Sequence, residues 1–236
     1  MASLQQEALE IVQGLGVHRT QPRGGQRRDS NARNMKDMRP EALYEVLKER
    51  RSFNLQDLLP DAIAPACVQH MLEAANWAPS HGHTEPWRFT VFAGTAREKL
   101  GDIFASVYQL LTPTERFDAA VMAFNRDRVL RAPVWISIGM QPDAVKRLPE
   151  WEEISAVAMA VHNMQLMACS LGLGSKWVSG PINRHALVAQ LVGLQPPAQL
   201  LGFLFVGKPA KAWPAGKRRP ITEKVQWATS HVTSMP

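Results

Sequence analysis

One stretch of the chain is apolar on nearly every side, and it limits how the rest of the molecule can fold. It reads WEEISAVAMAVHNMQLMACSLGLG, residues 151–174, and Gly172 would close it. A helix that is hydrophobic all round is buried, often between other helices or between subunits. We therefore expect a long helix that the rest of the chain, or a second copy, must cover.

Shorter elements surround this helix in the sequence. Pro40 and Pro65 each stand at the first position of a helix, and apolar spacing predicts helices at 39–52, 65–78, 95–111, 115–131 and 184–193, with strands at 87–94, 134–140 and 199–207. Thr95 and Thr112 start capping-box patterns, and Asn183 is expected to cap the helix after it. With about three strands among many helices, the chain belongs to the α+β class, a central sheet flanked by helices.

The first 39 residues differ in composition, so we assign residues 1–39 to an N-terminal extension and residues 40–236 to a single domain. Residues 17–39 are rich in Arg, Gly, Gln and Asn with almost no apolar side chains, which predicts disorder, while residues 4–15 have the spacing of a short helix. An alternative is an upstream start codon, with Met35 or Met38 beginning the native chain.

The formal net charge of +6 indicates an anionic partner, either nucleic acid or a small ligand. No run approaches the roughly 18 apolar residues of a membrane span, so no membrane partner is expected. The two cysteines, Cys67 and Cys169, are far apart within apolar patterns and are interpreted as buried thiols. These features predict a cytoplasmic protein.

Four separate stretches combine polar side chains with turn residues. They are KERRSFN at 48–54, APSHGHTEPWRF at 78–89, LGLGSKWVSGP at 171–181 and GKRRP at 216–220. Paired arginines followed by serine suit a phosphate, because Arg offers forked planar donors and Ser a compact hydroxyl. Each stretch alone is a weak signal, since arginines at a helix end are also favoured by the helix dipole.

In this order the four stretches, with LLGFLFVGKP at 200–209, resemble the FMN-dependent nitroreductase family over roughly residues 40–226. The resemblance implies a nitroreductase-like fold, with a central mixed sheet and the long helix at a dimer interface. It also implies FMN as cofactor, NADH or NADPH as reductant, and a homodimer in which both subunits build each FMN site.

The resemblance further implies which side chains hold the flavin. It places the phosphate and ribityl chain at the 50–54 segment and near the C-terminus, and the flavin ring at the 77–85 loop and the turn after the long helix. The residues are Arg50, Arg51, Ser52, Asn54, Trp77, Pro79, Ser80, His81, His83, Glu85, Trp177, Val178, Ser179, Gly180 and either Arg218 or Arg219. Relatives often have asparagine where His83 stands and glutamine where Glu85 stands, so these two contacts depart from the pattern.

The chemistry implied is transfer of reducing equivalents from NAD(P)H through FMN to a small acceptor such as a nitroaromatic, a quinone or an enal. The protein then positions and tunes the flavin, and no catalytic side chain is required. The sequence has no GxSxG, P-loop or HExxH motif and no GxGxxG after a strand. Both substrates would therefore use the flavin pocket in turn, which predicts ping-pong kinetics.

Two other functions remain open. His81, His83 and Glu85 have metal-ligand spacing and could serve a metal-dependent hydrolase, although no third His or Cys is near and His162 is expected to be a hydrogen-bonded core residue. A plain turn before the strand is the third reading of this segment. The basic extension could instead bind RNA, but no predicted strand interleaves aromatic and basic side chains, so we expect no nucleic-acid partner.

Overall fold

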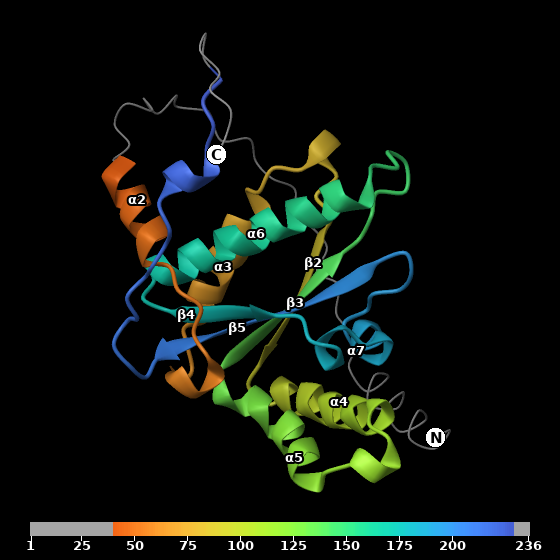
Figure 1. Cartoon of the computed structure of the whole chain (residues 1–236). Coiled ribbons are helices and arrows are strands. Elements are labelled where there is room, and N and C mark those ends of the chain that lie inside the picture. The colour runs from red at the N-terminus through yellow and green to blue at the C-terminus, as the bar shows by residue number, and fades with distance from the viewer. Residues whose placement is uncertain (1–39, 229–236) are drawn as a thin grey trace.

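In the computed structural model, which describes residues 40–228, a five-stranded sheet lies between two layers of helices (Figure 1). The strands are β1 (Leu58–Leu59), β2 (Trp87–Ala93), β3 (Val134–Met140), β4 (Gly174–Val178) and β5 (Gln199–Pro209). The order is β1-β5-β3-β2, and β4 also pairs with β5. Every strand pairing is antiparallel, and the parallel part of the expected mixed sheet is a single isolated bridge between Ser52 and Ser175.

Alternation along the central strands explains the two layers. In β3, Ile136 and Ile138 face one hydrophobic cluster while Trp135 faces the other, and in β5 Leu204 and Phe205 divide in the same way. Successive strand side chains point to opposite faces, so an apolar run without polar alternation needs cover on both sides. The α+β class predicted from the sequence is confirmed.

One face of the sheet is covered by α3 (Pro65–Asn76) and α6 (Glu150–Ser170), with α2 (Pro40–Glu49) lying beside the end of α6 (Figure 1). The other face is covered by α4 (Ala96–Leu111) and α7 (Ala186–Leu191), and α5 (Ala119–Asp127) packs on α4. Within residues 40–228, no helix combines the length and the apolar character needed to cross a bilayer.

Short 3-10 turns connect these elements: η2 (Leu55–Asp57), η3 (His81–His83), η4 (Thr114–Arg116), η5 (Arg128–Arg131), η6 (Ile182–Arg184) and η7 (Ile221–Lys224). Of these turns, η3 contains His81 and His83, η5 begins at Arg128, and η6 contains Asn183.

The predicted strands at 87–94, 134–140 and 199–207 are present as β2, β3 and β5. The 171–181 stretch, which was expected to be a turn, contains β4, because its backbone pairs with β5 over Gly174–Val178. The prediction that His162 is a core histidine is wrong, since its side chain is exposed on the outer face of α6. Cys67 and Cys169, expected to be buried, are only half-buried.

The predicted helix caps are wrong. Thr95 makes no capping hydrogen bond, and α5 begins at Asp118, whose carboxylate accepts from the backbone nitrogens of Ala120 and Val121. The α7 cap is His185, which accepts from Leu187, whereas Asn183 is buried and accepts a hydrogen bond from Arg128. The predictions for the extension, residues 1–39, lie outside the described residues.

Candidate functional site

The 50–54 segment and the start of β4 lie side by side. The Phe53 nitrogen donates to the Ser175 carbonyl over 3.2 Å, and a Cβ added to Gly174 would lie 2.7 Å from the Phe53 ring. Only glycine leaves room for this ring, so the close approach fixes the exposed Ser52 next to β4. Two of the four stretches, far apart in the sequence, therefore meet here.

Arg51 is already committed to the protein backbone. Its Nε donates to the Pro214 carbonyl over 3.1 Å, and its Nη1 donates to the Arg50 carbonyl over 2.8 Å and also to the Lys48 carbonyl. It thus ties the end of α2 to the segment 213–216, where a Cβ on Gly216 would collide with the guanidinium. Arg51 brings the C-terminal stretch to the site and has few donors left for a ligand.

Arg50 is the cation that is left without a partner. Within residues 40–228 its guanidinium makes no hydrogen bond or ion pair, although its side chain is half-buried. Burial is the main cause that lowers its pKa, and the charges of Arg218 and Arg51 lower the pKa further. Two neighbouring cations with no carboxylate between them form a site for an anion, and a phosphate ester fits this donor set.

Arg218, rather than Arg219, lies near Arg50. Arg219 is directed to Glu223 at 3.8 Å, while the Arg218 side chain donates only to its neighbouring Lys217 carbonyl. Asn54 is occupied as well, because Lys176 Nζ donates to its Oδ1 over 3.0 Å. Arg50, Ser52 and Arg218 thus remain available to bind an anion.

The site also contains His162 and Cys169, which the sequence analysis assigned to the core and not to the site. Burial and the positive charge of Arg50 lower the pKa of His162, and burial together with the charge of Glu49 raises the pKa of Cys169. Both side chains come from the last three turns of α6, a helix read from the sequence as core. Their i, i+7 spacing on one face is the signal that could have identified them.

The 77–85 loop is a strained turn at the other end of α6. His83 and Glu85 have φ angles of 57° and 45°, values that L-residues other than glycine rarely adopt. Ser80 Oγ accepts from the Glu85 nitrogen over 3.2 Å and closes the turn. A hollow of about 520 Å³ opens here, lined by Asn76, Trp77, Ala78, Pro79, Ser80, His83 and Glu85.

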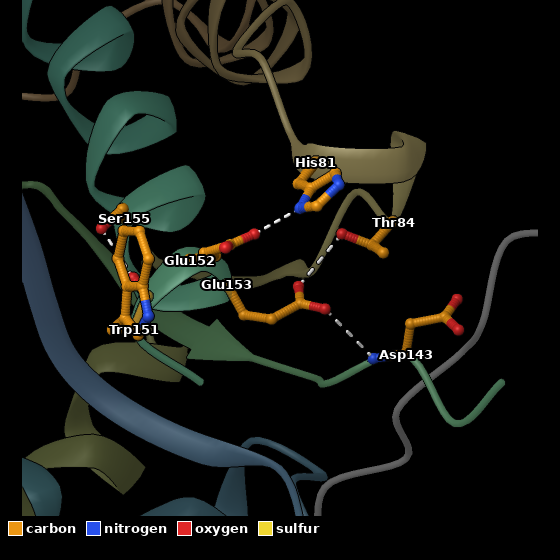
Figure 2. A network of polar contacts seen from close by, with 7 residues as sticks. All are labelled: His81, Thr84, Asp143, Trp151, Glu152, Glu153 and Ser155. Atoms are coloured by element: carbon orange, nitrogen blue, oxygen red, sulfur yellow. Dashed lines mark hydrogen bonds and ion pairs between the residues drawn. The ribbon is translucent and has the colours of Figure 1, made fainter. Parts of the chain in front are cut away.

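Two consecutive glutamates at the start of α6 hold this loop (Figure 2). His81 Nδ1 is hydrogen-bonded to the Glu152 carboxylate, and Thr84 Oγ1 donates to the Glu153 carboxylate over 3.0 Å. Glu153 is only 2% exposed and also accepts from the Asp143 nitrogen at 3.5 Å. Within residues 40–228 no group of three or more His, Cys, Asp or Glu side chains is arranged to hold a metal ion.

The turn after β4 lies at the opposite edge of the sheet from β2. Trp177 Nε1 donates to the Leu201 carbonyl over 3.1 Å, and the Val178 carbonyl lies so close to Gly202 that a Cβ there would be 2.1 Å away. Ser179 and Gly180 are exposed, and Ser179 borders a hollow of about 500 Å³ with Pro181 and Arg184. Backbone groups are therefore accessible at this turn.

The structure brings three of the four stretches together and leaves the fourth apart. The arginines lie beside His162 and Cys169, whereas the 77–85 loop contacts Glu152 and Glu153, 9 to 17 residues earlier in α6. At 1.5 Å per residue these places are roughly 15–25 Å apart. One chain therefore holds two candidate half-sites, one at each end of α6.

The sequence and the fold are both similar to known proteins. The model of the nitroreductase family matches residues 47–208. YfhC of Bacillus subtilis (strain 168), named as a candidate NAD(P)H nitroreductase, is 29% identical over 183 residues, 77% of this chain and 92% of its own.

Two solved structures are similar along most of their length. A nitroreductase-like family protein from Bacillus cereus superposes with a TM-score of 0.68 at 32% identity, covering 78% of this chain and 95% of its own. A candidate nitroreductase from Desulfovibrio desulfuricans, solved in complex with FMN, has a TM-score of 0.58 at 27% identity and covers 80% and 96%.

Proposed function

The chain belongs to the nitroreductase family, and on that premise we propose that it binds FMN and uses NADH or NADPH to reduce a small electron acceptor. Nitroaromatics, quinones and enals are the acceptor classes that fit. The observation that supports this most directly is the pair of cations, Arg50 and Arg218, with no counter-charge among the described residues.

The donor set fits the phosphate end of FMN. A phosphate ester carries up to two negative charges and several acceptor oxygens. Arg50 and Arg218 supply forked donors, and the exposed Ser52 supplies a hydroxyl beside them. Lys176, whose Nζ donates to Asn54 Oδ1 over 3.0 Å, adds a positive charge to the same segment.

The flavin ring requires surfaces that one chain does not bring together. We assign the ring to the Ser179–Gly180 turn and to the hollow formed by Trp77, Pro79 and Ser80. Because the 77–85 loop lies at the far end of α6 from Arg50, its hollow is assigned to the flavin of a second copy. A homodimer with two composite FMN sites satisfies both requirements.

The outer face of α6 supports such a dimer. Trp151, Ser155, Met159 and His162 form an exposed stripe at helical spacing, with Trp151 68% and Met159 41% exposed. Leu43, Tyr44 and Leu47 of the neighbouring α2 are exposed as well. Covering this apolar surface stabilises an assembly by about 25 cal/mol per Å².

When bound, FMN supplies the chemistry, since it accepts and returns a hydride. The protein's part is to hold the phosphate through Arg50, to present backbone donors at the turn after β4, and to keep water from the ring. No side chain is needed as a nucleophile or general base. The reductant and the acceptor use the same face in turn, which predicts ping-pong kinetics.

The test is made on the purified full chain. We expect a yellow protein with a flavin absorbance spectrum, release of FMN on denaturation, and oxidation of NADH or NADPH that depends on an added acceptor. Parallel lines in double-reciprocal plots would support ping-pong turnover. A colourless protein that takes up no FMN on reconstitution would contradict the proposal.

A further inference from the structure

Arg128, in η5, is a half-buried cation with no ion-pair partner among the described residues. Its Nη2 donates to Asn183 Oδ1 over 2.9 Å, and its guanidinium carbon lies 4.8 Å from the centre of the Phe104 ring. Its Nε is buried and has no acceptor among the described residues, and no carboxylate in residues 40–228 forms an ion pair with it. Burial lowers the pKa of Arg128 to about 10.

Such an arrangement is costly for stability alone. A buried charge loses its hydration, and a donor without an acceptor loses a hydrogen bond. An apolar side chain of similar volume at such a position is often neutral or stabilising. The cation–π contact with Phe104 and the one hydrogen bond to Asn183 offset part of this cost.

The neighbour, Asn183, connects Arg128 to the turn after β4. Asn183 is 4% exposed and lies in η6, directly after the Ser179–Gly180 turn. A guanidinium can only donate, so its partner atom must be the amide oxygen, and the Asn183 amide is thereby fixed with its nitrogen on the other side. That Nδ2 lies 3.7 Å from the place of a Cβ on Gly180.

We propose that Arg128 is a positioning residue for the flavin: it orients the Asn183 amide so that Nδ2 faces the Ser179–Gly180 turn, and it places a fixed positive charge behind that donor. The proposal rests on the function inferred above. Oxidised flavin is neutral in its ring, whereas reduced flavin is anionic at its N1 end. A pre-oriented donor and a positive charge in a buried setting therefore favour the reduced form.

The experiment compares FMN affinity in the two redox states. The dissociation constant of oxidised FMN is measured by fluorescence, and the midpoint potential of the bound flavin by equilibration with a reference dye. Together they give the affinity of reduced FMN. The variants are Arg128→Met, which removes the charge at similar volume, and Asn183→Asp, which keeps the acceptor for Arg128 but replaces the Nδ2 donor and neutralises the charge.

We expect both variants to bind oxidised FMN nearly as the unmodified protein does and to lose about tenfold in their preference for the reduced form. A tenfold change corresponds to about 30 mV for a two-electron couple. Arg128→Lys, which keeps the charge and one donor, should restore most of the preference. Arg126→Met is the matched control, since Arg126 is an exposed cation paired with Asp127 over 2.9 Å.

The outcomes distinguish the proposed role of Arg128 from the proposed binding of FMN. If the unmodified protein binds no FMN, the proposed function is wrong. If it binds FMN but Arg128→Met and Asn183→Asp leave the ratio of the two affinities unchanged, or weaken both redox states equally, Arg128 has only a structural role and the inference is overturned. The same ratio change in Arg126→Met would assign the effect to net charge and would also overturn it.

Discussion

At the scale of single residues, the site depends on which cations already have partners. Arg51 donates to three backbone carbonyls. Arg50, one position earlier, has no hydrogen-bond acceptor for its guanidinium among the described residues. The difference arises because Arg51 faces the 213–216 segment and Arg50 is directed toward α6. Adjacent identical side chains thus differ: Arg51 holds the backbone together, and Arg50 is available for a ligand.

Replacing Arg50 by alanine should weaken FMN binding by about 10- to 100-fold. A hydrogen bond to a charged group contributes roughly 1.5–3 kcal/mol, which corresponds to that range. The measurement is fluorescence titration of the flavin-free protein. Arg116→Ala is the control, because Arg116 is exposed in η4 on the α4–α5 side of the sheet. Full flavin occupancy and an unchanged dissociation constant in Arg50→Ala would refute the phosphate assignment.

His162 should report on the charge of Arg50. Burial and Arg50 lower its pKa, so the folded protein takes up this proton less readily than the unfolded chain. Its contribution to stability therefore falls as the pH drops from about 6.5 toward the lowered pKa. In Arg50→Ala the His162 pKa should rise, and adding FMN to the unmodified protein should also raise it. Histidine ring signals followed by NMR against pH provide the check, and a pKa that stays constant in both cases would count against this contact.

The sequence could predict that the 50–54 and 216–220 stretches share a ligand, but not which arginines bind it. That choice depends on backbone carbonyls at Lys48 and Pro214, which only the fold places near Arg51. In the same way, the pattern suggested Asn183 as a cap, whereas the half-buried Arg128 donates a hydrogen bond to its side chain. When a polar side chain has several available partners, the local sequence pattern cannot predict which one it takes.

At the scale of elements, continuous apolar runs were the reliable signal. Strands β3 and β5 are buried on both faces, and their sequences contain almost no polar residues that would interrupt the apolar run. Strand β4 was missed because Gly172, Gly174 and Gly180 suggested a turn, although Gly174 is there to admit the Phe53 ring. Strand β1 has two residues and leaves no periodicity to detect.

The start of α6 should be the anchor of the 77–85 loop. Glu153→Ala would leave Thr84 and the Asp143 nitrogen without their acceptor, and we expect a loss of about 1–3 kcal/mol in the free energy of unfolding. Glu152→Ala is the matched control on the neighbouring residue, since its partner His81 is largely exposed and such pairs contribute about 0–1 kcal/mol. Urea denaturation measures both. Equal losses in the two variants would show that Glu153 has no special role.

At the scale of the whole molecule, the two half-sites predict an obligate homodimer. Met159→Glu places a charge on the exposed stripe of α6 and should give a 26.3 kDa monomer that no longer retains FMN. Val121→Glu is the control, because Val121 is equally exposed, at 41%, but lies in α5 on the other side of the sheet. Sedimentation at sub-micromolar concentration measures both. A monodisperse monomer of the unmodified protein that still holds FMN and turns over would exclude the composite site.

The position of β5 has a consequence for how the protein is made. Three of the four strand pairings within residues 40–228 involve β5, yet it is the last strand of that part of the chain, beginning at residue 199. A ribosome must therefore complete most of the polypeptide before the sheet can close, and until then one edge of the apolar β3 stays unpaired. Non-local pairing of this kind folds slowly and exposes strand edges in the meantime. At a synthesis rate of about 5–20 residues per second, the seconds before β5 emerges are when the chain is most exposed to aggregation and most in need of a chaperone.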